Sequence, residues 1–252
     1  MQGHPDAAAV ARSNAASFSA IAGASPGGRV ARFGDSVAIL TPASPERPLL
    51  SGLFALGRDG FDEAYSWVEA GCAETGIEAF TVWLAAGDEA RASEMERRGH
   101  RLDGNPPLMS ALLDDIPSPR PLPLAEVKAP TAAMAAELND AVYGYPGSFL
   151  RAVGDPQEFP FLLAVLADLG RPVACAAGLP VGEDFHLTMV ATLPEHRRRG
   201  LAGGLVTLLA GWARESGCVT TSLVSSPAGE PMYEHLGYRG VGAVQMWERR
   251  LG

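Results

Sequence analysis

Residues 190–205 read Val-Ala-Thr-Leu-Pro-Glu-His-Arg-Arg-Arg-Gly-Leu-Ala-Gly-Gly-Leu, and this stretch decides the fold. The apolar residues around its start predict a strand over 185–192, and the spacing of the leucines after it predicts an amphipathic helix over 199–216. The first turn of a helix leaves backbone N–H groups unpaired and carries the positive end of the helix dipole, so it stabilises an anion. Small residues at 200 and 202–204 allow a phosphate to approach that backbone. The stretch is typical either of an anion site or of glycines that let a helix pack closely on a sheet.

The pattern of glycines and the overall charge exclude several function classes. The sequence has no G-x-x-x-x-G-K-S/T loop and no G-x-G-x-x-G fingerprint, so neither a P-loop nor a dinucleotide site is predicted. The formal charge of −9 argues against a nucleic-acid partner, which needs a basic face, and is a weak indication of a cationic substrate. Three separated cysteines predict neither a disulfide framework nor a zinc site, so we expect no metal.

The chain shows no sign of a targeting segment or of a membrane span. Its first residues lack a basic region followed by an apolar run, which is the pattern of a signal peptide. No apolar run approaches the ~18 residues of a transmembrane helix. We therefore expect a cytoplasmic protein with no membrane partner.

A proline-rich run divides the chain. Residues 116–123 read Ile-Pro-Ser-Pro-Arg-Pro-Leu-Pro, which cannot form the interior of a helix and predicts an extended linker. We therefore predict an N-terminal unit at 1–117, a linker at 118–124 and a second unit at 125–252. Each unit is expected to mix helices, at 6–22, 61–75, 88–98, 131–143, 199–216 and 231–236, with strands, at 37–40, 49–56, 79–85, 108–113, 161–168, 172–179, 185–192, 219–225 and 241–249.

The two units share one specific feature. Arg98-Gly99-His100-Arg101 joins a predicted helix to the next strand in the same way as Leu236-Gly237-Tyr238-Arg239 does later. We interpret this repeat as a diverged duplication in which the first unit lacks an obvious active site. Its long helix opens with Gly57-Arg58-Asp59-Gly60, where the first turn is not made of small residues and Asp59 repels a phosphate.

The second unit, from about Thr131 to Gly252, resembles the GNAT superfamily of N-acetyltransferases. The family signature (Gln/Arg)-x-x-Gly-x-(Gly/Ala) at a strand–helix junction is matched by Arg-Arg-Arg-Gly-Leu-Ala at 197–202. A second family block, Ser-x-x-Gly-x-x-apolar-Tyr-x-x-x-Gly-(Phe/Tyr), is similar to residues 226–238. The resemblance implies an α/β (α+β) fold with a mixed, mostly antiparallel central sheet flanked by helices. With the duplication, it implies two such units in tandem.

The resemblance also implies acetyl-CoA as the co-substrate. Backbone groups of the strand at 190–192 pair with the pantetheine arm in this family, and amides at the start of the helix hold the pyrophosphate. Arg197 has a second interpretation, in which it points away from the cofactor and only packs or carries surface charge. The implied cofactor contacts are Val190, Ala191, Thr192, Arg197, Arg198, Arg199, Gly200, Leu201, Ala202, Gly203 and Ser226.

Tyr233 is the residue that the resemblance implies as general acid. When an amine attacks the thioester, CoA leaves as a thiolate, and a hydroxyl within hydrogen-bond reach of the sulfur can protonate it. The alternative is that Tyr233 is a core aromatic on a short helix. Its place in the second family block favours the catalytic role.

His186 is the candidate general base, because the attacking amine must be neutral and must give up a proton. It lies eleven residues before Arg197, a spacing at which several GNAT families carry a base. A histidine titrates near neutral pH, which suits this task. The alternatives are a strand histidine without chemistry, with Glu183, Asp184 or a water chain as the base.

The sequence therefore predicts an N-acetyltransferase that moves an acetyl group to a primary amine of a small molecule or peptide, with one cofactor site. The alternatives are a non-catalytic acyl-CoA-binding module, a structural protein that keeps only the fold, and an enzyme for longer acyl chains. The acceptor and the oligomeric state are not specified. Acceptor contacts are expected from the first unit and from residues 141–155, with Tyr143, Tyr145 and Phe149, while Trp67 and Trp83 are expected in the core.

Overall fold

The computed structural model describes residues 3–153 and 159–251. In this part of the chain the helices are α1 (Ala7–Ala24), α2 (Phe61–Thr75), α3 (Glu89–Arg97), α4 (Ala132–Tyr143), α5 (Ser148–Val153), α6 (Leu201–Glu215) and α7 (Glu230–His235), with short 3-10 helices η1 (Pro48–Leu50), η2 (Leu113–Asp115) and η3 (Pro194–His196). The strands are β1 (Arg29–Phe33), β2 (Ser36–Leu40), β3 (Gly52–Ala55), β4 (Ala79–Ala85), β5 (Arg101–Gly104), β6 (Pro107–Leu112), β7 (Ala125–Glu126), β8 (Leu162–Asp168), β9 (Arg171–Val181), β10 (Asp184–Thr192), β11 (Thr220–Val224) and β12 (Arg239–Arg250).

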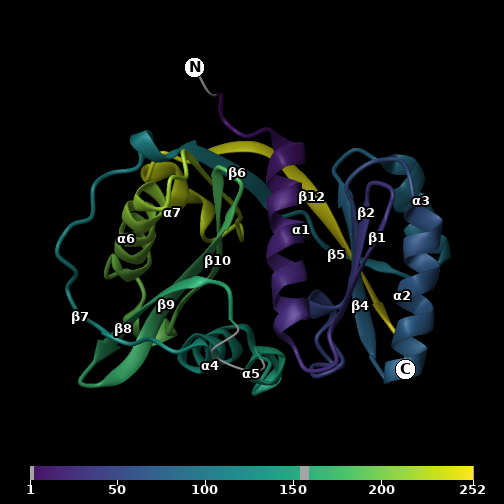
Figure 1. Ribbon diagram of the computed structural model, residues 1–252, viewed down its shortest axis with the longest axis horizontal. Helices are drawn as coiled ribbons and strands as arrows, with labels where there is room; N and C mark the ends of the chain where they lie inside the picture. The colour runs from purple at the N-terminus through teal and green to yellow at the C-terminus, as the bar shows by residue number, and fades with distance from the viewer. Residues whose placement is uncertain (1–2, 154–158, 252) are drawn as a thin grey trace.

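The strands form one sheet in the order β1-β2-β3-β4-β12-β6-β11-β10-β9-β8-β7, with β5 paired to β12 beside this path. Among the described strands, only β3–β4 and β10–β11 pair in parallel, and each half of the sheet holds one of these pairs. Helices α2 and α3 lie at one end of the molecule and α6 and α7 toward the other, with α1 between them and α4 and α5 along the lower side in the view of Figure 1. The predicted fold class, a mostly antiparallel mixed sheet flanked by helices, is confirmed.

Each half of the sheet is completed by a strand from the other half. Strand β6, which precedes the linker, pairs with β11 of the second half. Strand β12 runs beside β6 up to Ala243 and then lies between β4 and β5 of the first half, where Trp247 pairs with Val82 and Leu102. We call this arrangement the strand exchange. A cut at residue 117 separates paired strands, and the division of the chain into units at 1–117 and 125–252 stays a prediction.

The repeated helix–glycine–strand joint is present in both halves. Gly99 follows α3 with φ 83°, and Gly237 follows α7 with φ 99°, both in the left-handed region that glycine favours. The next residue is buried and hydrogen-bonded in each case. His100 bonds to Trp247 O at 3.0 Å, and the Tyr238 hydroxyl lies 3.0 Å from Thr221 Oγ1. The equivalent positions therefore have equivalent packing, which supports the duplication.

The proline-rich linker packs across α6. A Cβ atom added to Gly204 would lie 2.3 Å from Leu122 Cδ2, and one added to Gly211 would lie 3.4 Å from Pro119. A Cβ atom on Gly200 would meet no heavy atom within 4 Å. Close packing therefore explains Gly204, and leaves the start of α6 open.

The predicted strand at 49–56 is wrong in its first part. The 3-10 helix η1 occupies Pro48–Leu50, and β3 begins only at Gly52, because the ring of Pro48 fixes φ and suits a helical start. Strands β1, β5 and β7 and helix α5 were not expected. They are short, and β1 and β5 are mostly exposed, so they lack the apolar alternation that identifies a strand.

Candidate active site

The candidate site begins where β10 and β11 part. β10 pairs with β11 only from Asp184 to Leu187, whereas its pairing with β9 continues to Thr192. A bulge interrupts the latter pairing between Thr188 and Ala191, and Met189 within it has φ 52°. Beyond Leu187 the edge of β10 toward β11 therefore has no strand partner in the described chain. A cavity of about 870 Å³ borders this open edge.

The loop before α6 presents a row of unpaired amides. The backbone N–H groups of residues 198–203 donate no hydrogen bond to any described residue, and the first helical bond joins Gly204 N to Gly200 O. Arg198 and Gly200 have φ 62° and 76°, so the chain turns sharply here. The start of α6 also borders the cavity. Positive dipole ends and free donors at a cavity wall suit a phosphate group.

The three consecutive arginines differ in their contacts. The Arg197 Nε group donates to Thr192 O at 3.1 Å, which holds this side chain against the end of β10. Arg199 lies 3.7 Å from Asp168 and does not border the cavity. Arg198 borders the cavity and has no hydrogen bond or ion pair with a described residue. Arg198 is therefore the guanidinium of this group that remains available to a bound anion.

The other predicted cofactor contacts also border the cavity. Thr192 Oγ1 is buried with no hydrogen-bond partner among the described residues. The Ser226 hydroxyl accepts from Gly229 N at 3.2 Å, which fixes the turn before α7. The cavity-lining residues from the predicted set are Val190, Ala191, Thr192, Arg197, Arg198, Gly200, Leu201, Ala202, Gly203 and Ser226.

These groups fit the acyl-CoA that the sequence predicts. The free amides at 198–203 suit a pyrophosphate, and the open edge of β10 suits the amide-containing pantetheine arm. The buried, unpaired hydroxyl of Thr192 requires a partner, because an unsatisfied buried polar atom is costly. The assignment of individual contacts stays a prediction.

Tyr233 projects from α7 into the same cavity. It is buried, and its ring lies 5.6 Å from that of Tyr238 in an edge-to-face contact. The Tyr233 hydroxyl has no hydrogen-bond partner in the described chain. Burial, and then the nearby Tyr143, raise the pKa of Tyr233, so the hydroxyl keeps its proton at neutral pH. The residue can therefore act as a proton donor.

His186 lines the cavity on β10 and is 1% exposed. Its Nδ1 atom lies 2.9 Å from Ser222 Oγ on the neighbouring strand. Burial lowers the pKa of His186 to about 4, although the Asp184 carboxylate acts in the opposite direction. The imidazole is therefore neutral at pH 7 and can accept a proton.

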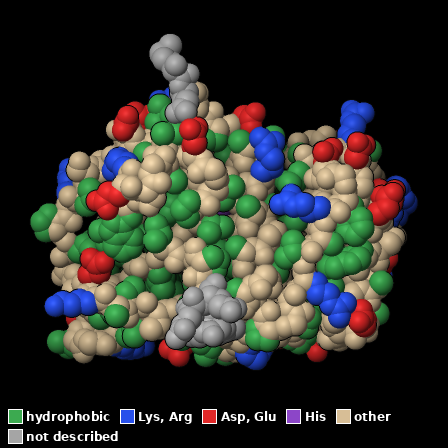
Figure 2. Space-filling model, viewed as in Figure 1, with side chains coloured by type: hydrophobic (Ala, Val, Ile, Leu, Met, Phe, Trp, Pro, Cys, Tyr) green, Lys and Arg blue, Asp and Glu red, His purple; other side chains and the backbone are tan. Residues whose placement is uncertain are grey.

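The first half supplies a wall of the cavity that the sequence did not identify by residue. Phe18 and Ile21 of α1, Leu50 of η1 and Trp83 of β4 line it. The rings of Phe18 and Trp83 lie 5.7 Å apart, so Trp83 belongs to the core and also to the cavity wall. In the view of Figure 2, hydrophobic side chains also gather on the surface over the α6 end of the molecule. No sequence motif marks these wall residues, because their periodicity is that of ordinary core positions.

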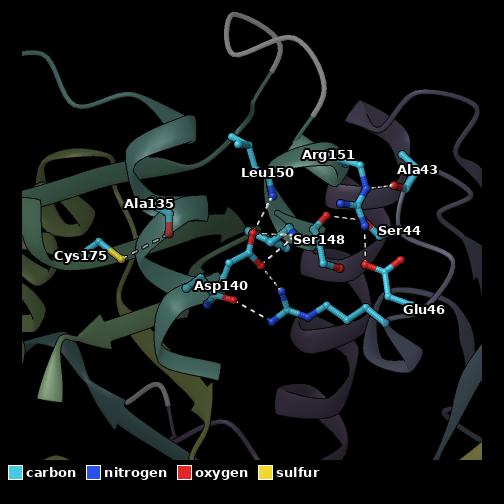
Figure 3. A network of polar contacts seen from close by, with 12 residues as sticks. Ala43, Ser44, Glu46, Ala135, Asp140, Ser148, Leu150, Arg151 and Cys175 are labelled. Carbon is cyan, nitrogen blue, oxygen red and sulfur yellow. Dashed lines mark hydrogen bonds and ion pairs between the residues drawn. The ribbon is translucent and has the colours of Figure 1, made fainter. Parts of the chain in front are cut away.

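A buried ion pair joins the start of η1 to helix α4. Arg47 lies 2.9 Å from Asp140, and each side chain is 4% exposed. The Asp140 carboxylate also accepts from the backbone N–H of Phe149 at 2.9 Å and of Leu150 at 3.2 Å, so it caps α5. Figure 3 shows Asp140 at the centre of this network, with Arg151 reaching the Ala43 carbonyl and Glu46. The segment around Arg47 therefore holds the α4–α5 turn in place.

The predicted acceptor segment is only partly on the cavity. Tyr143 and Phe149 line it, whereas Tyr145 does not and instead stacks on the Arg47 guanidinium with a centroid distance of 5.1 Å. Residues 154 and 155 of the predicted segment lie outside the described residues. The side of the cavity away from α6 is therefore formed jointly by α4, α5 and the first half.

Comparison with known proteins relates the second half of the chain to one family. Residues 127–238 match the profile of the acetyltransferase (GNAT) family. No curated protein matches the chain. Solved structures with a similar fold include a GCN5-related N-acetyltransferase from Kribbella flavida (TM-score 0.68, 18% identity, 98% of this chain and 96% of that chain covered).

Two further structures show the same fold. One is a GCN5-related N-acetyltransferase from Sphaerobacter thermophilus (TM-score 0.56, 18% identity, 86% and 81% covered). The other is a tandem GNAT protein from the clavulanic acid biosynthesis pathway (TM-score 0.55, 15% identity, 91% and 85% covered), which agrees with a duplicated fold.

Two searches of the described residues were negative. None of these helices combines the length and apolar character that a membrane span requires. No group of three or more His, Cys, Asp or Glu side chains in this part of the chain is arranged to hold a metal ion. Residues 127–238 therefore match the GNAT acetyltransferase family, and the fold of the chain is similar over nearly its whole length to that of a GCN5-related N-acetyltransferase.

Proposed function

We propose that this protein transfers an acetyl group from acetyl-CoA to a primary amine by direct attack, at one cofactor site in the second half. The proposal rests on one observation, that three features border the same cavity. They are the open edge of β10, the unpaired amides before α6, and the pair of Tyr233 and His186. A phosphate site alone requires only the second of these features.

Different residues of the cavity bind the cofactor, accept a proton and donate a proton in this proposal. Amides 198–203 and Arg198 hold the pyrophosphate, and the edge of β10 aligns the pantetheine arm. Acetyl-CoA supplies the activated acetyl group when it is bound. His186 accepts the proton that the amine must lose, and Tyr233 donates its hydroxyl proton to the departing sulfur. Each is in the protonation state that its role requires, because burial lowers the pKa of His186 and raises that of Tyr233.

The acceptor amine carries an apolar body in this proposal. The wall from the first half is built of Phe18, Ile21, Leu50 and Trp83, and none of the described lining residues is Asp or Glu. A second positive charge on the acceptor would be buried without a partner, which is costly. The weak indication of a cationic substrate from net charge is therefore not supported by the cavity wall.

A turnover screen tests the proposal. Free-thiol release from acetyl-CoA is followed with primary amines that pair an apolar ring with one amine, and with diamines of similar length. Turnover is expected with the first group and not with the second. Binding of acetyl-CoA without turnover on any amine would instead identify a non-catalytic acyl-CoA-binding module. Absence of binding would leave only a conserved fold.

A further inference from the structure

A chain of hydrogen bonds joins His186 to Asp184 through Ser222. The His186 Nδ1 atom lies 2.9 Å from Ser222 Oγ, and that oxygen lies 2.5 Å from Asp184 Oδ2. The strand register produces this contact, because His186 pairs with Ser222 while Asp184, two residues earlier, points to the same face of β10. Ser222 is fully buried and Asp184 is half-buried.

The direction of these hydrogen bonds fixes the tautomer of His186. A carboxylate has no proton to donate, so Ser222 gives its one hydroxyl proton to Asp184. The Ser222 oxygen then accepts from Nδ1–H of His186. The opposite arrangement would place two acceptor oxygens 2.5 Å apart. The Nε2 atom of His186 is therefore unprotonated, and it makes no hydrogen bond within the described chain.

The Asp184 carboxylate is itself held from both halves of the molecule. It accepts from Ser13 Oγ of α1 at 2.8 Å and from Thr220 Oγ1 at 2.9 Å. It borders a second cavity of about 450 Å³, so water reaches it. The other charged residues on these cavities are Arg12 and Glu183 on the one that Asp184 borders, and Arg47, Arg197 and Arg198 on the one that His186 borders. The titratable groups His196, His235, Tyr143 and Tyr233 also border the cavity of His186.

We propose that Ser222 and Asp184 are positioning residues that hold His186 as the Nδ1–H tautomer, so that Nε2 faces the acceptor amine as a base. This inference rests on the proposed function. The amine proton moves to Nε2, and the Asp184 carboxylate stabilises the resulting imidazolium through Ser222. The bond from the amine nitrogen to the acetyl carbon forms, the thioester C–S bond breaks, and CoA leaves as the thiol with the proton of Tyr233. His186 then releases its extra proton to solvent and Tyr233 takes one from solvent, so the proton balance closes.

A spectroscopic test reads the tautomer without any turnover. In ¹⁵N-correlated NMR spectra of the imidazole at pH 7, the native protein is expected to show His186 protonated at Nδ1 and bare at Nε2. Ser222→Ala is expected to produce the Nε2–H tautomer, and Ser222→Thr, which keeps the hydroxyl, is expected to restore the native signal. Because this readout needs no acceptor, it separates failure of the inference from failure of the proposed function.

Kinetics test the contribution to catalysis. Ser222→Ala and Asp184→Asn are expected to lower kcat roughly 10- to 100-fold with an unchanged KM for acetyl-CoA, a smaller loss than removal of a general base. The Asp184 carboxylate raises the pKa of His186, so its removal lowers this pKa. Asp184→Asn is therefore also expected to move the acidic limb of the pH–rate profile to lower pH. The control is Thr221→Val, which removes the two buried hydrogen bonds of the next side chain along the same strand, to Phe185 O and to the Tyr238 hydroxyl.

Several results would overturn the inference. One is a native His186 protonated at Nε2, and another is a Ser222→Ala protein with the native tautomer. A third is a loss of turnover in Thr221→Val as large as in Ser222→Ala, which would indicate a general packing effect. If Ser222→Ala does not fold, Asp184→Asn and the native spectrum carry the same test.

Discussion

The N-termini of α2 and α6 are built alike, because each is a 15-residue helix that follows a glycine with φ 76°. Their surroundings differ. The first turn of α2 carries Asp62 and Glu63, whereas the first turn of α6 has no acidic residue. A Cβ atom on Gly60 would lie 1.8 Å from the Phe33 carbonyl oxygen, so the chain itself fills the space before α2. The space before α6 is open.

This difference teaches that a helix end becomes an anion site only where space and charge permit. Both helices have the same dipole, but in α2 it is compensated by acids of its own first turn. The joint after the next helix shows the same divergence. Four residues before the helix-ending glycine lies Tyr233 in the second half and Met95 in the first. In the proposed function, the first half keeps only the backbone of the fold, and the second also carries the functional groups.

The largest expected effect comes from making the second half resemble the first at Tyr233. Tyr233→Phe removes the proton donor and is expected to lower kcat by roughly 100-fold or more, with little change in acetyl-CoA affinity. Steady-state kinetics and calorimetry measure the two quantities. Tyr238→Phe is the matched control, because this neighbouring tyrosine does not line the cavity. Unaltered turnover in Tyr233→Phe would remove this residue from the mechanism.

Giving α6 the acidic first turn of α2 is expected to have the next largest effect. Ala202→Asp places a negative charge among the unpaired amides and is expected to weaken acetyl-CoA binding roughly 30-fold, by repulsion of the pyrophosphate. Ser216→Asp adds the same charge at the exposed far end of this helix and is expected to leave the dissociation constant within about twofold. Equal effects of the two changes in calorimetry would show that the start of α6 does not hold the anion.

The two capping glycines are expected to respond differently to alanine. Gly200→Ala costs about 1 kcal/mol of unfolding free energy, because a left-handed φ disfavours a side chain. Gly60→Ala adds a clash with the Phe33 carbonyl and is expected to cost roughly 2–4 kcal/mol. Urea unfolding of both variants measures this difference. Losses of equal size would contradict the claim that only the space before α2 is filled.

A smaller effect concerns one buried histidine in each half. Burial lowers the pKa of both His100 and His186 to about 4, from an ordinary value of 6.5. Above pH 6.5 both histidines are mostly neutral in the folded and in the unfolded protein. As the pH falls from 6.5 toward 4, the unfolded chain binds protons that the folded protein does not, so the unfolding free energy falls.

Substitution of either histidine tests this linkage. His100→Gln and His186→Gln are each expected to lose less unfolding free energy than the native protein between pH 7 and pH 5. Urea titrations at the two pH values provide the measurement. The change of unfolding free energy with pH could equal that of the native protein in His100→Gln but be smaller in His186→Gln. This result would limit the effect to the second half.

Much of this architecture follows from the sequence, and the reasons for the exceptions are physical. The strand–helix junction at 190–205 was predicted because its periodicity changes there and its glycines mark the helix start. Segments such as β1 were missed because they are exposed and paired only at an edge. The partner strands of β6 and β12 could not be predicted, because pairing between distant strands leaves no local pattern.

The site was predictable to a similar degree. His186 and Tyr233 could be identified from motif and spacing, and the structure places both on one cavity. Ser222 has no signal in the sequence, since its role depends on the register of β11 against β10. Phe18 and Trp83 are core residues that also face the cavity. Their sequence pattern is that of the core alone, so it does not indicate the cavity.

The strand exchange has a consequence for how the protein is made. A ribosome releases the first half long before β12, yet the place between β4 and β5 stays vacant until β12 arrives. Until then β4 presents an unpaired edge, the kind of surface that promotes association between chains. Strand β6 likewise stays unpaired on its β11 side until β11 has been synthesised. The sheet of the nascent first half therefore stays incomplete until β12 is made, so the order of synthesis couples its completion to that of the half with the candidate site.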